Sequence, residues 1–176
     1  MNKELLMDHL RCIPDFPKKG INFRDVTTLY KDAECMQEMV NEMYELYKDK
    51  GITKIVGIES RGFIMAAALA VKLGAGVVLA RKPGKLPSTV IKESFSKEYG
   101  VDTVEMHLDS IDENDIVLIH DDLLATGGTA KATYSLVKHF NPKEIYMNFI
   151  IEIKDEGLHG RDEFDGLCEV TTLLTI

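Results

Sequence analysis

Cysteine is scarce in this sequence, and its placement excludes several kinds of covalent and metal chemistry. The three cysteines, Cys12, Cys35 and Cys168, are odd in number and far apart in the chain. This spacing excludes a disulfide framework, a Cys-x-x-Cys redox pair and a zinc site built from cysteines. The five histidines show no His-Glu-x-x-His or similar metal-ligand spacing. We therefore expect a reduced, cytoplasmic protein whose cysteines are buried packing residues.

Positive charge and long apolar runs are also lacking. The 21 lysines and arginines are outnumbered by 29 aspartates and glutamates, which gives a net charge of −8 at pH 7. This balance argues against binding of nucleic acid or an anionic membrane through bulk charge. No apolar run reaches the roughly 18 residues of a membrane span, and residues 1–10 resemble no signal peptide. Any anion that the protein binds must be held by a local arrangement of groups.

The chain is long enough for one domain, and its residues are apolar enough for a full core. With 176 residues, 45% of them hydrophobic, we predict a single domain over residues 1–176. Strand-like and helix-like segments alternate, and this order indicates a parallel sheet covered by helices on both faces. The expected helices span residues 3–12, 32–51, 62–73 and 129–139. Buried strands are expected at residues 54–58, 77–80 and 115–120, with further strands at 144–153 and 166–176.

Residues 81–100 fit neither the helical nor the strand pattern. They are rich in Lys, Ser, Pro and Gly and show little periodicity. Loops of this length are uncommon in compact domains unless they act as lids or binding loops. We predict a mobile loop here, followed by an exposed strand in which Val104, Met106 and Leu108 alternate with polar residues.

Ligands of parallel sheets bind beyond the carboxyl ends of the strands, and one such strand end carries an anion-binding pattern. Residues 125–129 combine small side chains, two hydroxyls and two glycines at the start of an expected helix. Their backbone N–H groups can converge on a phosphate monoester at the positive end of that helix. The pattern matches neither a Walker A loop nor a dinucleotide-binding Gly-x-Gly-x-x-Gly. The proposed 5′-phosphate ligands are Ala125, Thr126, Gly127, Gly128 and Thr129.

Asp121 and Asp122 directly precede this loop. Their carboxylates can accept hydrogen bonds from sugar hydroxyls or approach a metal ion. Two adjacent aspartates alone are better explained as a solvated acidic turn with a helix N-cap. The phosphate-binding loop beside them favours the sugar-binding interpretation.

The run Asp-Asp-Leu-Leu-Ala-Thr-Gly-Gly-Thr at residues 121–129 resembles the phosphoribosyl-pyrophosphate signature of type I phosphoribosyltransferases, in the form of members that act on adenine. His120 stands where this family has an aliphatic residue, and we assign it no role. Other segments are similar to the family's base-site segment, pyrophosphate loop, flap ends and C-terminal motif: residues 15–25, 59–63, 81–87 with 98–100, and 158–161. The resemblance covers nearly the whole chain. It implies the family's mainly parallel, twisted sheet, with a small hood over about residues 1–30 and a mobile flap over about residues 82–100.

The resemblance implies transfer of a phosphoribosyl group from 5-phosphoribosyl 1-pyrophosphate to adenine, giving AMP and pyrophosphate through an oxocarbenium-like transition state. Asp121 and Asp122 would bind the ribose, and Mg²⁺ would be held near them, mainly by the pyrophosphate and ribose. Glu98 would handle the proton of the base, with Tyr99 beside it in the flap, and Arg61 would act in catalysis. The implied pyrophosphate-binding residues are Glu59, Ser60, Arg61, Arg81, Lys82 and Lys85, and the base-binding residues are Asn22, Phe23 and Arg24. The family also has a non-proline cis peptide near Glu59 and Ser60, and a homodimer in which Arg81 would reach the partner's site.

Simpler interpretations accompany these assignments. Residues 59–62 alone are about equally well explained as a helix cap with a surface arginine, and residues 81–85 as a solvated basic loop. Phe23 beside Arg24 also fits a core aromatic next to a surface cation. Two alternative functions remain open: the same transfer to another purine, and a non-catalytic regulator that senses the sugar donor. Regulators of that kind usually carry an added DNA-binding domain or a basic face, which a chain with a net charge of −8 does not favour. A generic phosphate-binding domain would explain residues 125–129 but not the other motifs.

Overall fold

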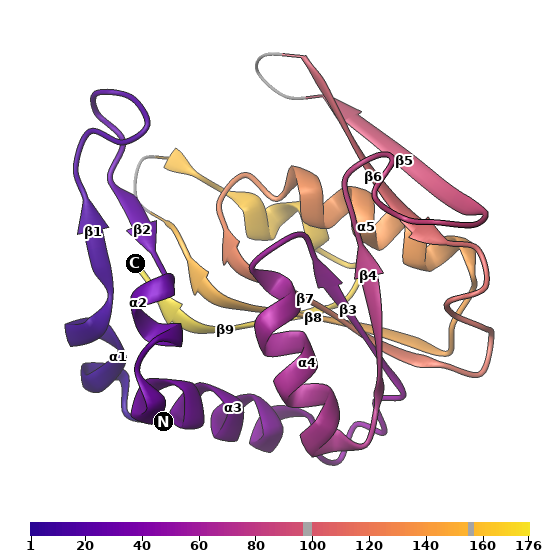
Figure 1. Ribbon diagram of the computed structural model, residues 1–176, viewed down its shortest axis with the longest axis horizontal. Helices are drawn as coiled ribbons and strands as arrows, with labels where there is room; N and C mark the ends of the chain where they lie inside the picture. Colours follow the sequence, from indigo (N-terminus) through magenta and orange to yellow (C-terminus); the bar gives the residue numbers. More distant parts are fainter. Residues whose placement is uncertain (97–99, 155–156) are drawn as a thin grey trace.

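The computed structural model describes residues 1–96, 100–154 and 157–176. Its centre is a five-stranded sheet with the strand order β4-β3-β7-β8-β9, and all neighbouring strands are parallel (Figure 1). The strands are β3 (Lys54–Ile58), β4 (Gly76–Ala80), β7 (Ile116–Leu124), β8 (Glu144–Glu152) and β9 (Glu169–Thr175). The predicted parallel sheet is confirmed. None of the helices in the described residues is long and apolar enough to cross a membrane.

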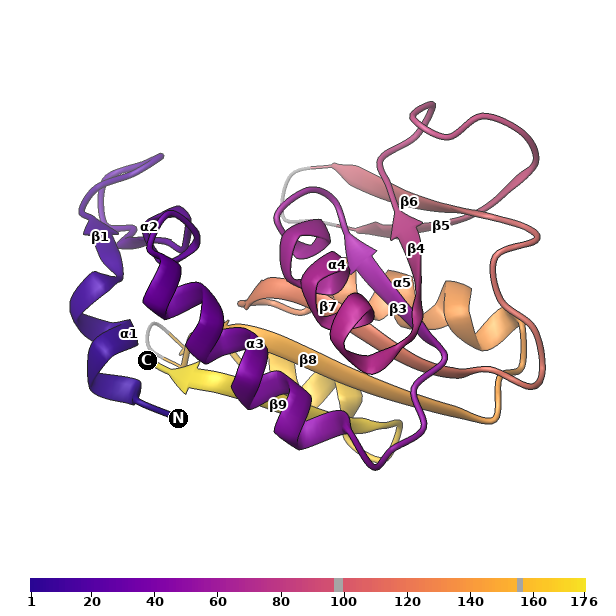
Figure 2. The same cartoon turned by 60° about the horizontal axis from the view of Figure 1, so that its bottom comes forward.

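Helices cover both faces of this sheet, as the alternation of strand and helix patterns predicts. On one face, α3 (Ala33–Tyr47) and α4 (Gly62–Leu73) bury Met43 and Leu69 in a cluster with Ile55. On the other face, α5 (Gly128–His139) buries Val137 against Val117. Figure 2 shows the helices separated by the sheet in this way. The two apolar clusters hold the sheet rigid, so that its strand ends can position a site.

Two helix ends agree with the sequence pattern in their capping chemistry. The Asp32 carboxylate accepts a hydrogen bond of 2.9 Å from the backbone N–H of Cys35 and caps α3. Gly74 adopts φ +72° and ends α4, a left-handed conformation that glycine takes at little cost. Helix α3 ends at Tyr47, before the predicted residue 51.

An N-terminal unit lies to one side of the sheet (Figure 1). It consists of α1 (Lys3–His9), β1 (Arg11–Ile13), β2 (Phe23–Asp25) and α2 (Thr27–Tyr30), with β1 and β2 antiparallel. The helix predicted over residues 3–12 is wrong at its end, because residues 11–13 pair with β2 instead. Cys12 is consequently exposed on a two-stranded ribbon, whereas Cys35 is buried and Cys168 half-buried. The expectation of three buried cysteines therefore holds fully only for Cys35.

The segment predicted as a mobile loop over residues 82–100 contains a strand. Strand β5 (Val90–Ser96) pairs antiparallel with β6 (Val101–His107), from Val90 opposite His107 to Ser96 opposite Val101. The prediction that the second strand is exposed is also wrong, because Val104 and Met106 are 5% and 0% exposed and pack in the α5 cluster. A two-stranded ribbon needs a packing surface to be stable, and this ribbon uses the α5 face of the domain.

Strand β4 was expected to be buried, but Val77 and Leu79 are 41% and 37% exposed. The reason is its place at the end of the strand order, where a strand has a neighbour on one side only. Strand β7 differs in the other direction. It runs to Leu124 and therefore includes Asp121 and Asp122, which were expected in a loop.

Candidate active site

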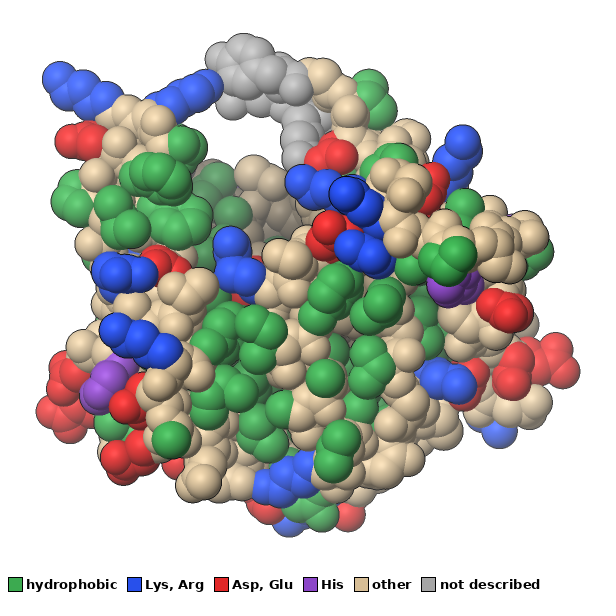
Figure 3. Space-filling view, in the orientation of Figure 1, with side chains coloured by type: hydrophobic (Ala, Val, Ile, Leu, Met, Phe, Trp, Pro, Cys, Tyr) green, Lys and Arg blue, Asp and Glu red, His purple; other side chains and the backbone are tan. Residues whose placement is uncertain are grey.

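The carboxyl ends of three adjacent strands bring most of the predicted site residues together. Residues 59–61 follow β3, residues 81–82 follow β4, and Asp121 and Asp122 lie near the end of β7. A cavity of about 280 Å³ is lined by Glu59, Ser60, Arg61, Lys82, Asp121 and Asp122. Figure 3 shows this region as a hollow with basic and acidic side chains along its rim.

The predicted phosphate-binding loop, residues 125–129, connects β7 to the start of α5. Gly127 takes φ +81°, and α5 begins at the next residue. The first hydrogen bond of this helix runs from the backbone N–H of Lys131 to the carbonyl of Gly127. The N–H groups before it have no partner inside the helix, so they can bind an anion at its positive end. A cavity of about 130 Å³ lies over this loop and shares Asp121 with the larger cavity.

The loop after β3 contains a cis peptide bond between Glu59 and Ser60, at the position that the resemblance implies. The Glu59 carboxylate accepts hydrogen bonds from the Lys82 backbone N–H at 2.9 Å and from Arg81 Nε at 3.2 Å. The Lys82 bond is the main cause that lowers the pKa of Glu59. Glu59 therefore remains ionised and ties the loop after β3 to the two cations after β4.

Asp121 and Asp122 occupy different electrostatic surroundings. Asp122 forms an ion pair with Arg61, and its own backbone N–H donates to Asp121 Oδ1 at 2.9 Å. Burial raises the pKa of Asp121 well above its ordinary value, and the charge of Asp122 raises it further. The surroundings of Asp121 thus favour its neutral form, whereas Asp122 is held by the Arg61 cation, and this difference suits the two side chains to different hydrogen-bonding roles toward a sugar.

The N-terminal unit contributes an aromatic ring beside this cavity. Phe23 in β2 is half-buried, and the Arg61 guanidinium carbon lies 5.9 Å from the centre of its ring. Phe16 packs edge-on against the same ring at 5.2 Å, and the Tyr30 hydroxyl donates to the Arg61 carbonyl at 3.4 Å. The predicted base segment and the predicted pyrophosphate loop are therefore neighbours. Arg24 is half-buried and Asn22 exposed.

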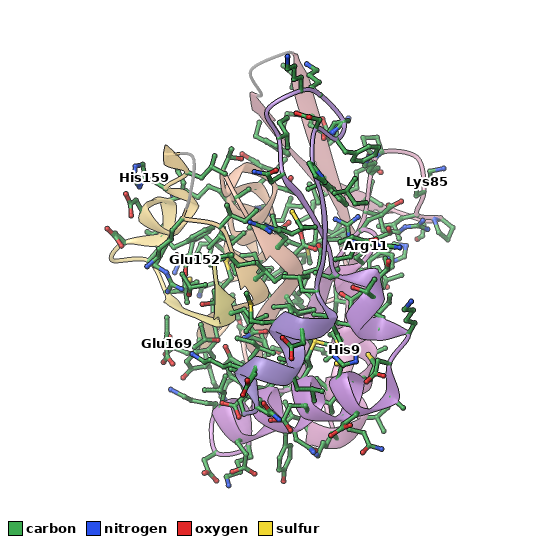
Figure 4. The ribbon with its side chains drawn as sticks, turned by 90° about the vertical axis from the view of Figure 1, so that its left-hand side faces the viewer. His9, Arg11, Lys85, Glu152, His159 and Glu169 are labelled. Carbon is green, nitrogen blue, oxygen red and sulfur yellow. The ribbon has the colours of Figure 1, made fainter. Side chains whose placement is uncertain are left out.

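Other predicted residues lie at the margin or outside the described structure. Lys85 is exposed at the outer edge of the molecule (Figure 4), its carbonyl accepts a hydrogen bond from Arg81 Nη1 at 3.1 Å, and its charge contributes to the lowered pKa of Glu59. Glu98 and Tyr99 lie outside the described residues.

Glu105 is a buried site residue that the sequence analysis missed. Its carboxylate accepts from the Gly84 N–H at 3.0 Å, and its backbone pairs with Arg81 through two hydrogen bonds. The sequence pattern does not indicate it, because Glu105 stands on the opposite face of the alternating strand from Val104 and Met106, where a solvent-exposed residue is expected.

Two anion-binding loops at the carboxyl edge of a parallel sheet, with aspartates between them, are the arrangement of a phosphoribosyl transferase domain. A family model with the description "Phosphoribosyl transferase domain" matches residues 26–165. The adenine phosphoribosyltransferase of Phocaeicola vulgatus is 61% identical over 176 residues, which is 100% of both chains. That of Bacteroides thetaiotaomicron is also 61% identical, over 100% of this chain and 99% of its own.

Solved structures agree with the sequence relatives. Adenine phosphoribosyltransferase from Rhodothermus marinus has a TM-score of 0.91 at 44% identity, covering 98% of this chain and 97% of its own. The enzyme from Giardia lamblia, solved in complex with 9-deazaadenine, has a TM-score of 0.92 at 39% identity, covering 100% and 98%. This chain belongs to the adenine phosphoribosyltransferase family.

Proposed function

We propose that this protein transfers the phosphoribosyl group of 5-phosphoribosyl 1-pyrophosphate to adenine and releases AMP and pyrophosphate, a purine salvage reaction. The observation that carries the proposal is the placement of two anion-binding loops at adjoining strand ends, with two aspartates between them. The sugar donor has a monoester phosphate at one end, a diphosphate at the other and a ribose between. The relatives of this chain, 61% identical over its full length, carry the name of this activity.

Each part of the site has a task in substitution at the anomeric carbon. The bond from this carbon to pyrophosphate breaks, the bond to a nitrogen of adenine forms, and positive charge develops on the sugar ring. Residues 125–129 hold the 5′-phosphate, and Arg61, Arg81 and Lys82 stabilise the negative charge of the leaving pyrophosphate. Asp121 and Asp122 hold the sugar hydroxyls while the ring flattens. Glu98 accepts the proton that adenine loses, and closure of the flap excludes water.

The residues at the cavity fit a Mg²⁺ ion. Three carboxylates line it, from Glu59, Asp121 and Asp122, and carboxylate oxygens are the ligands that Mg²⁺ takes up with substrate phosphates. Glu59 is already engaged by Arg81 and the Lys82 backbone, and Asp122 by Arg61, so Asp121 is the side chain that would approach the ion first, with Asp122 beside it. When bound, Mg²⁺ would neutralise part of the charge on the pyrophosphate.

Adenine would bind in the N-terminal unit. Phe23 offers an aromatic face beside Arg61, and Arg24 and the backbone at Asn22 can orient the flat base. The alternative of another purine concerns these same residues, since the phosphate and sugar contacts are common to all bases.

We further propose a homodimer formed through α4 and β4. This edge exposes apolar side chains: Val71 is 87% exposed, Ile64 42%, Val77 41% and Leu79 37%. Figure 3 shows hydrophobic side chains gathered on the lower half of this face, over α4. Contiguous apolar patches on soluble proteins mark interaction sites. Arg81 follows β4 directly, with its guanidinium carbon 5.9 Å from the Phe63 ring, so a partner docked here would bring Arg81 close to both sites. We place the protein in the cytoplasm, where its free thiols stay reduced.

The deciding experiment incubates the protein with the sugar donor, Mg²⁺ and one purine at a time, and measures nucleotide and pyrophosphate. Adenine is expected to give AMP and an equal amount of pyrophosphate. Product from hypoxanthine, guanine or xanthine instead of adenine would overturn the base assignment. Donor binding without any product from any base would support the non-catalytic regulator.

A further inference from the structure

Residues 158–161 follow β8 and take no part in the reaction steps proposed above. Its 3₁₀ turn η2 (Gly160–Phe164) lies directly against the phosphate-binding loop. A methyl group on Gly160 would lie 2.9 Å from the Gly127 backbone nitrogen and closer still to the Ala125 carbonyl oxygen. A methyl group on Gly127 would in turn lie 2.8 Å from the Gly160 carbonyl oxygen. The two backbones are therefore packed without room for a side chain at either glycine.

Arg161 anchors this turn to the sheet. Its Nε donates to Glu152 Oε1 at 2.8 Å and its Nη2 to Glu152 Oε2 at 2.6 Å, a two-bond arrangement with high geometric specificity. Its Nη1 also donates to the Val170 carbonyl of β9 at 2.7 Å. Glu152 is buried, and the hydrogen bond from Arg161 lowers its pKa, so the pair remains charged at neutral pH. Figure 4 shows Glu152 inside the fold, beneath the C-terminal segment.

The position of Glu152 connects this anchor to the phosphate-binding loop. Glu152 is the last residue of β8 and pairs in register with Leu124, the last residue of β7 and the one before the loop. A second connection comes from the loop's other end, because Lys131 Nζ of α5 donates to the Glu163 carbonyl of η2. The turn is thus tied to both ends of the loop that it contacts in the middle.

We propose that Arg161 is a positioning residue for the 5′-phosphate of the sugar donor, acting through Gly160. The Arg161–Glu152 pair holds Gly160 against Ala125 and Gly127, and this contact fixes the direction of the loop's N–H groups. Arg161 itself does not touch the substrate. The inference rests on the proposed function, because it takes residues 125–129 as the 5′-phosphate site.

This role predicts a selective effect on ligand binding. Arg161 contacts the β8 and β9 side of the sheet, whereas the pyrophosphate loop follows β3 on the other side of β7. Binding of ribose 5-phosphate depends on residues 125–129, which Gly160 supports. Binding of pyrophosphate depends on residues 59–61, which Gly160 does not support. A general loss of structure would weaken the binding of both ligands.

The experiment measures the dissociation constants of ribose 5-phosphate and of pyrophosphate, with Mg²⁺, for Arg161→Gln, Arg161→Lys and Gly160→Ala. Arg161→Gln and Gly160→Ala are expected to raise the dissociation constant of ribose 5-phosphate and the KM of the donor about tenfold or more. The dissociation constant of pyrophosphate should change less than about twofold. Arg161→Lys should recover part of the loss, since lysine keeps the charge but cannot form two parallel bonds. Lys50→Gln is the control, because it removes an exposed ion pair to Glu169 at the start of β9, at the opposite end of the strand from the phosphate-binding loop.

An equal rise in the dissociation constants of both ligands, or an unchanged dissociation constant for ribose 5-phosphate, would overturn the inference. If Arg161→Gln does not fold, Gly160→Ala decides, because it leaves the ion pair intact. The wild-type reaction distinguishes failure of the proposed function from failure of the positioning role. Absence of AMP from the wild type contradicts the proposed function, whereas normal turnover with an unaltered Gly160→Ala contradicts only the positioning role.

Discussion

His120 lies in the middle of the central sheet, one residue before the aspartates of the site, and its side chain is fully buried. Its Nδ1 lies 3.0 Å from Asn148 Oδ1 in the next strand, and Asn148 Nδ2 donates to Thr171 Oγ1 at 2.8 Å. The Tyr47 hydroxyl of α3 lies 2.6 Å from the same Thr171 oxygen. Among the described residues, His120 Nε2 has no hydrogen-bond partner. His120 therefore begins a polar row across the three strands β7, β8 and β9.

The buried His120 predicts that the stability of the folded protein decreases in acid. Burial lowers the pKa of His120 from 6.5 to about 4, even though Asp122 on the same strand opposes the shift. The unfolded chain then takes up a proton below pH 6.5, and the folded chain only near pH 4. The stability that depends on a neutral His120 is complete above pH 6.5 and is lost as the pH falls toward 4.

Urea unfolding at two pH values checks this expectation. From about pH 7.5 to about pH 5, His120 should account for a loss of about 2 kcal/mol of unfolding free energy, which His120→Val should remove. His139→Gln, which changes an exposed histidine at the end of α5, is the control and should leave the pH dependence as it is. An unchanged pH dependence in His120→Val would show that the proton is taken up elsewhere.

Gly62 provides a second prediction for a single residue. A methyl group there would lie 2.7 Å from the His120 carbonyl oxygen and 3.1 Å from Asp121 Oδ1. Gly62→Ala must therefore move the start of α4 away from β7, and with it the loop that carries Arg61. We expect a loss of about 1–3 kcal/mol in unfolding free energy, together with a raised KM for the sugar donor. A Gly62→Ala enzyme with normal stability and KM would contradict this close packing.

At the scale of elements, the β5–β6 hairpin is the clearest departure from the sequence-based expectation. It packs on α5 through Val104 and Met106, and it joins the central sheet where Arg81 pairs with Glu105. The hairpin therefore forms part of the core beside the site.

Truncation of its buried side chains tests this role. Met106→Ala is expected to lower the unfolding free energy by about 2–5 kcal/mol, as for other buried methionines. Leu108→Ala is the control, because Leu108 is 47% exposed just beyond the same strand, and it should cost less than about 1 kcal/mol. Similar small effects of both changes in chemical denaturation would place the hairpin outside the cooperative core.

At the scale of the whole molecule, a chain of net charge −8 is proposed to bind a polyanion. The structure resolves this conflict because cationic side chains and a helix N-terminus are gathered at the cavities. Arg61 and Lys82 line one cavity, Arg81 is next to it, and the start of α5 faces another. Net charge therefore argues against nucleic acid as a partner but not against a small phosphate ester.

The proposed dimer belongs to this scale. Val71→Lys combined with Leu79→Lys places two charges on the exposed apolar edge and is expected to give a monomer in sedimentation experiments. Because Arg81 would then lack a partner site, turnover should fall about tenfold or more. Leu167→Lys, at a residue that is 43% exposed elsewhere, should change neither property. A wild-type monomer, or a monomeric variant with full activity, would contradict the proposal.

Much of the site could be predicted because its chemistry is local in the chain. Residues 125–129 contain their own glycines and helix start, and residues 59–62 likewise follow a strand and open a helix. The hairpin could not be predicted in the same way, since its polar residues disguise the alternation and its stability depends on α5, distant in sequence. Arg161 was noticed as a motif, but its partner Glu152 becomes apparent only when β7, β8 and η2 are brought together.

The sequence by itself determined the class of fold and the three strand ends that come together at the candidate site. These depend on periodicity, on glycine at set positions and on the order of short motifs, all of which are properties of neighbouring residues. Only the tertiary structure decided that Asp122 is buried and paired with Arg61, that Glu59 ties two loops together, and that Gly160 packs against Ala125 and Gly127. These features depend on burial and on contacts between distant segments, and both arise only when the chain is folded.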